Sequence, residues 1–459
     1  MAFDESSWLR LEPASGETLR AALARTLREA ITSGALRPGS RLPSSRALAT
    51  QLGVSRGVAT DAIAQLAAQG FLEIDARRAP VVAVTAVSHP SPAARAPARP
   101  TPRYDLSPAT PDVTLFPARA WGAAMRHALR TASVRALDYG DPRGEPGLRE
   151  LLAEQLGRTR GVVTEPDRII VVQGTAQGLD LVLRVLRERG ARRIAVEDPS
   201  LAALHRRIEA NLLQPLPKPV DARGIVVDDS MGDAVLVTPA HQFPTGAVMS
   251  GERRRELIAS GALVLEDDYD GEFRYDREPV RALQGLAPHQ VVYFGTVSKT
   301  LAPSLRLGWV AAPPDLADEL AHAKLLADFG SPILDQLALR RLLETGEYDR
   351  HVRRARAVYR RRRDALAIAL ARHLPDMEPR GISAGLHVLL PLQPGSDDVA
   401  AAEAAERTGV CVDAVSRYAF TRGEPGFVVG YGRAHEDAIE PAISLLAEER
   451  ARAGGLHGT

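Results

Sequence analysis

From Tyr104 onward, short apolar runs alternate with stretches of helical periodicity, and this alternation constrains the fold more than any other feature. Apolar runs of four to six residues bounded by turn residues are typical of buried strands. Buried strands separated by helices predict an open α/β sheet. The expected strands are 168–172, 193–196, 234–237, 263–265 and 291–294, and helices are expected at about 176–189 and 201–211. Residues 376–450 mix both patterns, which predicts a smaller α+β part.

A long helix is expected at about 350–373. It carries many arginines, and we interpret them as a solvated face of the helix. These arginines are Arg353, Arg354, Arg356 and the run from Arg360 to Arg363.

The length and composition limit the classes of protein to which this chain can belong. A chain of 459 residues is too long for one core, so two or three domains are expected. The net charge of +1 means that any nucleic-acid surface is a local patch. The single cysteine, Cys411, lies in an apolar run and is expected to be a small buried hydrophobe. The sequence shows neither a signal peptide nor a membrane span, so we expect a cytoplasmic protein without membrane contact.

The first 86 residues show the pattern of a helix-turn-helix followed by a wing. A helix is expected from Thr18 to Ser33, a second one is capped by Ser44 or Ser45, and a third is capped by Ser55. The tight turn at 53–55 joins the second and third helices. Strands at 71–74 and 81–84 are expected to form the wing around a basic turn.

The positions that would meet DNA in this pattern carry polar or basic side chains. The start of a recognition helix faces the base edges, while neighbouring polar groups contact phosphates. The candidates are Arg46, Ser55, Arg56 and, on the wing, Arg77 and Arg78. Arg56 could pair with guanine through two hydrogen bonds. A protein-binding helical module is the alternative, because helix-turn-helix patterns also arise by chance.

Three stretches of this region resemble the winged helix-turn-helix of the GntR family of bacterial regulators. They are 39–49 (GSRLPSSRALA), 52–56 (LGVSR) and 66–72 (LAAQGFL). The resemblance implies operator DNA as a partner. Many relatives carry a glycine-rich wing tip, whereas this chain has Ala76, Arg77, Arg78, Ala79 and Pro80 there.

Residues 87–103 are rich in proline, alanine and arginine and cannot build a core. We expect an extended tether of the kind that proline-rich linkers form. The expected domains are therefore a DNA-binding domain at 1–86, a linker at 87–103 and an effector domain at 104–455.

Lys299 is one of three lysines in a chain that otherwise uses arginine for positive charge. A lysine amine can lose its proton and attack an aldehyde, whereas a guanidinium cannot. Lys299 follows the apolar run 291–294, lies among hydroxyl residues, and precedes Arg306. This layout fits a Schiff-base lysine between phosphate ligands. A surface lysine in a polar turn is equally compatible with the local sequence.

Two further stretches suggest a ligand site at the carboxyl edge of the sheet. Gly174, Thr175 and Ala176 follow a strand and open a helix, where free N–H groups can hold a phosphate. Asp267 and Tyr269 follow the strand 263–265, where an acid could pair with a protonated ring nitrogen. Each stretch alone is also an ordinary helix start or an acidic loop.

Together these stretches resemble fold-type I pyridoxal-phosphate enzymes of the aspartate aminotransferase group, over residues 104–450. Behind a GntR-type domain they resemble the MocR subfamily of transcriptional regulators. The matched stretches are 139–144 (YGDPRG), 147–149 (GLR), 197–199 (EDP), 239–246 (PAHQFPTG), 266–275 (EDDYDGEFRY) and the run around Lys299.

The resemblance implies a cofactor, pyridoxal 5'-phosphate, and a role for each matched residue. Lys299 would form the internal aldimine, Asp267 would pair with the pyridine nitrogen, and Tyr269 would donate to the ring oxygen. Tyr139 would reach the phosphate of the neighbouring subunit, which implies a homodimer. The phosphate ligands would be Gly174, Thr175, Ala176, Thr296, Ser298 and Arg306.

Two positions depart from the pattern of the enzymes. Leu201 stands where relatives often place an aromatic ring that stacks on the cofactor. Val428 stands where aminotransferases carry the arginine that binds the substrate carboxylate, and Arg433 is no obvious substitute. We therefore expect a homodimeric transcriptional regulator that binds two operator half-sites and senses pyridoxal phosphate or an amino compound through Lys299. A working aminotransferase with an accessory DNA-binding domain, and a regulator whose cofactor site is merely structural, remain as alternatives.

Overall fold

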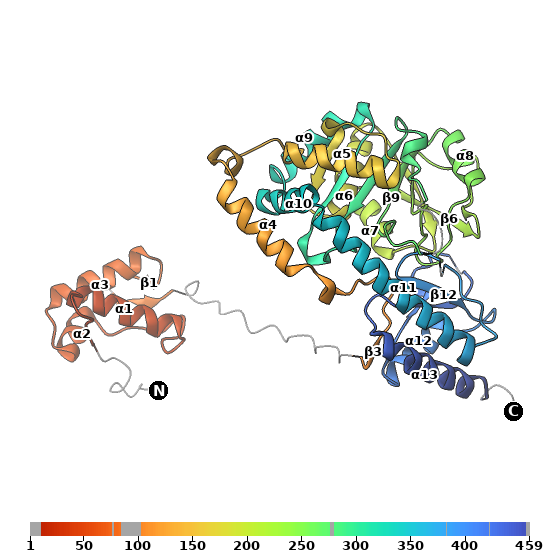
Figure 1. Cartoon of the computed structure of the whole chain (residues 1–459). Coiled ribbons are helices and arrows are strands. Elements are labelled where there is room, and N and C mark those ends of the chain that lie inside the picture. Colours follow the sequence, from red (N-terminus) through yellow and green to blue (C-terminus); the bar gives the residue numbers. More distant parts are fainter. Residues whose placement is uncertain are drawn as a thin grey trace. The chain divides into compact units, whose positions relative to one another are not determined.

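A computed structural model describes residues 11–75, 78–83, 102–275, 280–381, 383–421 and 423–455. The chain forms two compact units, one within residues 1–100 and one within residues 101–459 (Figure 1). Residues 84–101, which include most of the linker expected at 87–103, lie outside the described residues, as does the wing residue Arg77. Of the helices that the structure describes, none is both long and apolar enough to cross a membrane.

The N-terminal unit has the expected helix-turn-helix and wing. Ser44 and Ser55 accept hydrogen bonds from the first turns of the second and third helices, and this capping sets where those helices begin. Gly53 ends the second helix in the left-handed conformation. Leucines and alanines from all three helices form one buried core with Val82 of the wing. The elements are α1 (Leu19–Thr32), α2 (Ser45–Leu52), α3 (Arg56–Ala68), β1 (Leu72–Glu73) and β2 (Val81–Val82).

An eight-stranded mixed sheet forms the centre of the second unit, in the order β4-β11-β10-β9-β8-β5-β6-β7. The strands from β10 to β6 in this order are parallel, while β11 pairs antiparallel with both β10 and β4. Its strands are β4 (Ile169–Val172), β5 (Arg193–Asp198), β6 (Gln214–Asp221), β7 (Gly224–Ile225), β8 (Ala234–Val237), β9 (Leu263–Asp267), β10 (Val291–Thr296) and β11 (Gly308–Ala311). The expected open α/β sheet is therefore confirmed.

Helices pack against both faces of this sheet, because its central strands are apolar on both sides. One buried cluster lies between the sheet and α6 and α9, and another lies between the sheet and α5 and α10. The helices are α4 (Ala118–Thr131), α5 (Pro146–Arg160), α6 (Thr175–Glu188), α7 (Ala202–Ala210), α8 (Gly251–Ala259), α9 (Pro314–Asp328) and α10 (Ile333–Glu344). Short 3-10 turns are η1 (Val113–Leu115), η2 (Val134–Leu137), η3 (Pro166–Arg168), η4 (Gln284–Leu286) and η5 (Pro303–Leu305).

The smaller α+β part holds a three-stranded antiparallel sheet covered by helices. The long helix α11 contacts α10 of the larger part and α13 of the smaller part (Figure 1). The elements of the smaller part are β3 (Tyr104–Asp105), α11 (Glu347–His373), β12 (His387–Pro391), α12 (Asp398–Arg407), β13 (Val410–Cys411), β14 (Asp413–Ala414), η6 (Val415–Arg417), β15 (Gly426–Gly430) and α13 (Glu436–Gly455).

Two expectations about side chains need correction. Arg362 and Arg363 of α11 are buried and do not belong to a solvated face. Arg362 instead donates to Asp112 at 2.7 Å, which ties the helix to the segment that follows β3. Cys411 is half-buried rather than fully buried, and its Sγ lies 3.4 Å from Ser107 Oγ.

Candidate cofactor cavity and DNA-contacting helix

A cavity of about 360 Å³ lies at the carboxyl edge of the central sheet. Its size is in the range of sites that enclose a small organic ligand. Seven of the ten predicted cofactor residues line it: Thr175, Asp267, Tyr269, Thr296, Ser298, Lys299 and Arg306. They come from the ends of β4, β9 and β10 and from the loop before β11. The parallel strands bring them together, because their carboxyl ends meet at one edge.

Lys299 lies three residues after the end of β10, half-buried, with its side chain in the cavity. Its Nζ donates a hydrogen bond to the carbonyl oxygen of Ala109 at 2.6 Å. Burial lowers the pKa of the Lys299 amine, although the carboxylates of Asp270 and Asp267 oppose this change. A lowered pKa increases the fraction of neutral amine, which is the nucleophilic form.

Asp267 ends β9 and presents a carboxylate to the cavity. Its Oδ1 is buried and accepts no hydrogen bond from any described residue. Burial, together with the neighbouring Asp268, raises the pKa of Asp267 to about 7, while Lys299 acts in the opposite direction. A buried acceptor without a donor is uncommon in folded proteins and indicates that a cationic or N–H group of a ligand belongs there.

Tyr269 points its hydroxyl toward the loop that follows β8. The hydroxyl donates to the carbonyl oxygen of His241 at 3.0 Å and lies 3.3 Å from its Nδ1. Burial, with Asp270 nearby, raises the pKa of Tyr269 well above its ordinary value. The phenol is therefore neutral and able to donate.

The start of α6 and Arg306 form a cradle suited to a phosphate. Gly174 has a φ of +83°, and a Cβ on it would lie 2.5 Å from Arg306 Nη2. Arg306 Nη2 donates to the carbonyl oxygen of Gln173 at 2.9 Å, which holds the guanidinium beside the helix start. Opposite, Thr296 Oγ1 and Ser298 Oγ lie 2.8 Å apart. Free helix N–H groups, two hydroxyls and one guanidinium are the donors that bind phosphate.

Three predicted residues do not reach the cavity. Gly174 and Ala176 are absent from its described lining, although Gly174 adjoins Arg306. Tyr139 is 85 % exposed, and its ring packs at 5.7 Å from that of Phe329. Tyr139 is not part of the described cavity lining.

The positions that depart from the enzyme pattern lie as follows. Leu201 is part of the cavity wall. Val428 is fully buried in β15, in a cluster with Leu389 and Val415 against which the lining residue Tyr418 packs, but Val428 itself does not line the cavity. Arg433 is engaged by Asp105 at 2.9 Å. Among the described residues that line the cavity, Arg306 is the one arginine.

Several residues of the cavity were not assigned roles from the sequence. Glu197 lies in its wall, accepts hydrogen bonds from Thr238 and Gln242, and burial raises its pKa to about 7. The Glu-Asp-Pro stretch held a signal for it, because a charged pair after a strand is unusual in a core. Ala109 contributes a backbone carbonyl, for which no side-chain signal exists. The other unassigned residues are Pro108, Thr110, Val196, Ser200, Leu204, Leu236, Val237, Thr238, Phe243, Pro303 and Tyr418.

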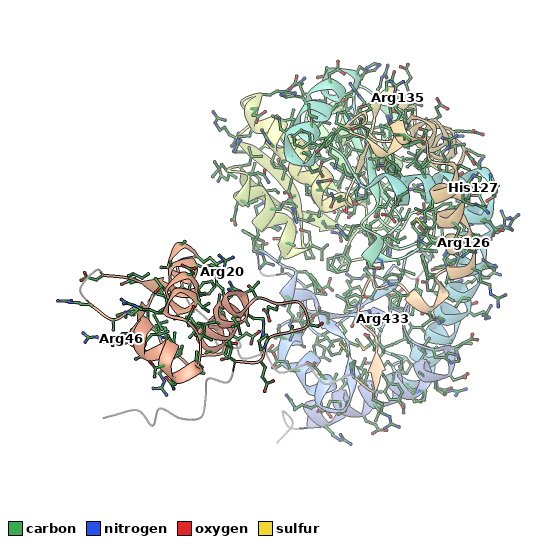
Figure 2. All side chains as sticks on the ribbon, turned by 90° about the vertical axis from the view of Figure 1, so that its left-hand side faces the viewer. Arg20, Arg46, Arg126, His127, Arg135 and Arg433 are labelled. Carbon is green, nitrogen blue, oxygen red and sulfur yellow. The ribbon has the colours of Figure 1, made fainter. Side chains whose placement is uncertain are left out.

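In the N-terminal unit, the predicted DNA-contacting residues lie at two helix starts. Arg46 is exposed in the first turn of α2 (Figure 2), and Arg56 is exposed at the first position of α3. No described residue pairs with either guanidinium, so both are free for an anionic partner. Ser55 caps α3 with Oγ accepting from Val58 N at 3.3 Å. Arg78 lies 3.8 Å from Asp75 on the wing.

The fold and the cavity together define a fold-type I pyridoxal-phosphate protein joined to a winged helix-turn-helix. Residues 110–428 match the family described as aminotransferase class I and II, and residues 19–82 match the bacterial regulatory proteins of the gntR family. The chain belongs to the MocR subfamily of GntR-family transcriptional regulators, in which these two parts are fused.

Similar proteins agree with this assignment over nearly the whole chain. The HTH-type pyridoxine biosynthesis transcriptional regulator PdxR of Corynebacterium glutamicum is 33% identical, over 96% of this chain and 98% of its own. The probable rhizopine catabolism regulatory protein MocR of Rhizobium meliloti is 30% identical, over 92% and 91%. A crystal structure of Pyrococcus horikoshii kynurenine aminotransferase, in complex with PMP, superimposes with a TM-score of 0.69 at 26% identity, over 76% of this chain and 90% of that one.

The residues of the cavity fit pyridoxal phosphate, the cofactor of this fold family. The acceptor at Asp267 Oδ1 suits a protonated pyridine nitrogen, and the cradle at Gly174 and Arg306 suits a phosphate. Lys299 presents its amine in the same cavity. The chain is thus a pyridoxal-phosphate-binding transcriptional regulator.

Proposed function

We propose that this regulator binds operator DNA as a homodimer and uses the Lys299 cavity to sense pyridoxal phosphate or an amino compound. Arg46, Ser55, Arg56 and Arg77 contact the DNA in this proposal, with α3 in the major groove. The observation that carries the sensing role is a cavity lined by seven of the ten predicted cofactor residues, in which the described lining holds no arginine besides Arg306 that could bind a substrate carboxylate.

In this proposal each cavity residue has one task. The Lys299 amine holds the cofactor covalently, and its half-buried position limits access of water. Asp267 keeps the pyridine nitrogen protonated, Tyr269 donates to the ring oxygen, and Arg306 with Thr175, Thr296 and Ser298 binds the phosphate. When bound, the cofactor supplies an aldehyde carbon that can exchange one amine for another.

Sensing without steady turnover is supported by the surroundings of the cavity. Val428 is apolar, buried and not part of the cavity lining, and Arg433 already pairs with Asp105. An amino acid that enters the cavity therefore meets no described carboxylate clamp other than Arg306, which the cofactor phosphate occupies in this proposal. Amine exchange at Lys299 would instead change the charge and shape of the cavity and shift the balance between protein conformations.

The homodimer is supported by apolar side chains exposed around η2. Leu129, Val134, Leu137 and Tyr139 all belong to one segment, and Phe329 contacts Tyr139. Exposed apolar patches of this kind mark protein interfaces. We define Leu129, Val134, Leu137, Tyr139 and Phe329 as the η2 patch. A second copy on this patch would place Tyr139 near the neighbouring phosphate site, as in the related enzymes.

The decisive experiment measures binding to the region upstream of the protein's own gene, by electrophoretic shift, with and without pyridoxal phosphate and candidate amines. We expect the wild-type affinity or complex pattern to change at least about tenfold with the effective ligand. Lys299→Ala should keep DNA binding, lose the visible absorbance of lysine-bound cofactor, and lose the ligand response. Lys218→Arg, which alters a lysine outside the cavity, is the matched control and should behave as the wild type.

Two results would contradict the proposal. Sustained conversion of an amino donor and a keto acid would show an enzyme. A Lys299→Ala protein that loses the absorbance but keeps an unchanged ligand response would make the cofactor structural.

A further inference from the structure

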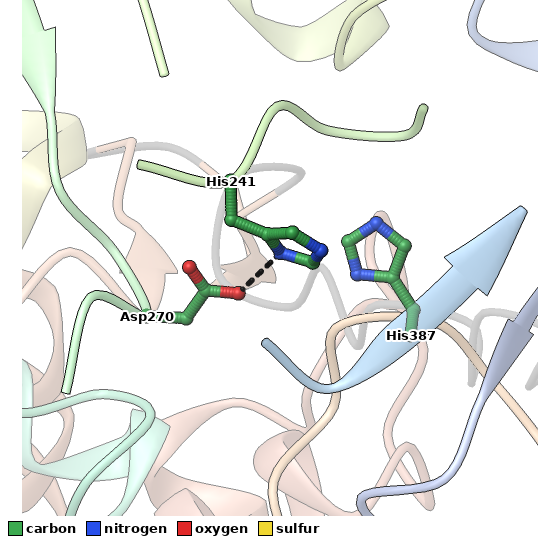
Figure 3. Close-up of side chains that lie close together, drawn as sticks. All are labelled: His241, Asp270 and His387. Atoms are coloured by element: carbon green, nitrogen blue, oxygen red, sulfur yellow. Dashed lines mark hydrogen bonds and ion pairs between the residues drawn. The ribbon is translucent and has the colours of Figure 1, made fainter. Parts of the chain in front are cut away.

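Three buried side chains with metal-binding donor atoms lie close together (Figure 3). His241 comes from the loop after β8, Asp270 from the loop after β9, and His387 from the first residue of β12. One ligand atom of each residue lies within 4.8 Å of the others. All three side chains are at most 2 % exposed.

The donor atoms of this cluster are poorly satisfied by the protein. His241 Nδ1 lies 2.9 Å from Asp270 Oδ2, while His241 Nε2 has no hydrogen-bond partner among the described residues. Both ring nitrogens of His387 also lack one. The two imidazole rings are 4.6 Å apart at their centroids, inclined by 48°. A neutral imidazole always carries one N–H and one lone pair, and the backbone of Pro244 interacts with the His387 ring, so at least one of its two nitrogens is buried and unused.

A glycine in the neighbouring backbone leaves the space that His241 and Asp270 occupy. Gly385 has a φ of +71°, and a Cβ there would lie 2.1 Å from His241 Nδ1 and 2.6 Å from Asp270 Oδ2. The carbonyl oxygen of Gly385 accepts hydrogen bonds from Tyr275 and Tyr431, each at 2.7 Å, which fixes the strand end in place. Any side chain at position 385 would therefore displace two of the potential metal ligands, His241 and Asp270.

We propose that His241, Asp270 and His387 form a binding site for a divalent metal ion, with zinc as the best match. Two imidazoles and one carboxylate are a common zinc donor set, and neutral histidine is the form that binds. The ion replaces the proton that His241 Nδ1 shares with Asp270. A water molecule completes the coordination.

This site differs from the proposed cofactor site, although the two adjoin. Tyr269 contacts the cluster through His241 and also lines the cavity. His387 and Asp270 do not line the cavity. Metal at the cluster would fix the loop after β8 against β12, which belongs to the smaller part of the effector unit. The proposal does not depend on the regulator's effector.

The test is the metal content of untagged full-length protein, produced in medium supplemented with zinc and measured by mass spectrometry of the elements. We expect about one zinc per chain. Cobalt-substituted protein, unfolded and refolded with the metal, should show the visible absorption of a four-coordinate cobalt site. His387→Gln and Asp270→Asn should each weaken metal binding by about 100-fold or more.

The control is His205→Ala, which removes another buried histidine with an unpaired nitrogen, Nδ1, that belongs to no cluster of three metal-binding donors among the described residues. It should retain the metal. A wild-type protein without stoichiometric metal after both routes would overturn the proposal, even if a variant does not fold. Equal metal binding by wild type and His387→Gln would also overturn it and leave a hydrogen-bonded network of water and side chains.

Discussion

The three lysines show how one residue type serves different ends in this chain. Lys218 pairs with Asp228 at 2.7 Å, and Lys324 is fully buried beside Asp328 at 2.7 Å. Lys299 donates instead to a backbone carbonyl and faces the cavity. The scarcity of lysine pointed to a chemical role at Lys299, but the same scarcity applies to two lysines that form ion pairs. The neighbours of Lys299 in space make the distinction.

At the scale of single residues, Asp267 gives a prediction about pH. Its pKa is raised from 3.8 to about 7 in the folded protein, so the folded state keeps a proton that the unfolded state releases earlier. The free energy of unfolding of the cofactor-free protein should therefore fall as pH rises from about 4 to 7. Asp267→Asn should reduce this fall by on the order of 1–3 kcal/mol, measured by urea unfolding across that range.

Asp376→Asn is the control for this prediction. Asp376 is a surface carboxylate whose pKa is lowered by Arg450, so this substitution should leave the fall between pH 4 and 7 in place. The pKa of Glu197 is also raised to about 7, so part of the fall in the free energy of unfolding should remain in Asp267→Asn. If the free energy of unfolding of Asp267→Asn varied with pH as it does in the wild type, the Asp267 carboxylate would be ionised in the cofactor-free protein.

At the scale of elements, the starts of α6 and α3 give one prediction each. Gly174→Ala at the start of α6 places a Cβ 2.5 Å from Arg306 Nη2 at a φ of +83°. The guanidinium must then move out of the phosphate cradle. We expect pyridoxal phosphate to bind about tenfold more weakly or worse, which corresponds to about 1.4 kcal/mol, in a titration followed by absorbance.

Gly190→Ala provides the matched control for the cradle. Gly190 has a similar φ of +98°, but no atom lies within 4 Å of the position of its Cβ. Its substitution also strains the backbone, but it does not touch the cavity. A similar loss of cofactor in both variants would mean that strain, and not the displaced arginine, is responsible.

Two substitutions at the start of α3 should separate the effect on DNA recognition from the effect on helix stability. Arg56→Ala removes an exposed guanidinium and should weaken specific operator binding by about 1–3 kcal/mol while it relaxes preference at one base pair. Ser55→Ala removes the cap and should lower the stability of the N-terminal unit by about 1 kcal/mol. Anisotropy with a set of single-base operator variants measures the first effect, and thermal unfolding measures the second. Unchanged sequence preference in Arg56→Ala would exclude a base contact.

At the scale of the whole molecule, the η2 patch predicts a dimer. Leu137→Glu places a charge among exposed apolar side chains and should weaken self-association by about 100-fold, because a buried unpaired charge is costly. Sedimentation velocity of the full chain should then show a monomer at concentrations where the wild type is a dimer. Leu286→Glu changes an equally exposed leucine outside the patch and should remain dimeric. Monomeric wild-type protein at high concentration would contradict the prediction.

Much of the fold followed from local signals. The caps at Ser44 and Ser55, the strand runs and the start of α6 lie within a residue or two of where the patterns placed them, because caps and hydrophobic periodicity act over one or two turns. The exceptions arise over long distances. Arg362 was taken for a solvated arginine, and its burial depends on Asp112, which is 250 residues away in the sequence.

By itself, the sequence determined the division into a winged helix-turn-helix and an α/β aminotransferase-like part, and it identified Lys299, Asp267, Tyr269 and Arg306 as candidates for one site. Only the tertiary structure decided what surrounds them. The carbonyl oxygen of Ala109 near Lys299, the close contact of Gly174 with Arg306, and the meeting of His241 with His387 join segments that are far apart in the chain. Such contacts depend on how strands align at a sheet edge, and local patterns of residues do not encode that alignment.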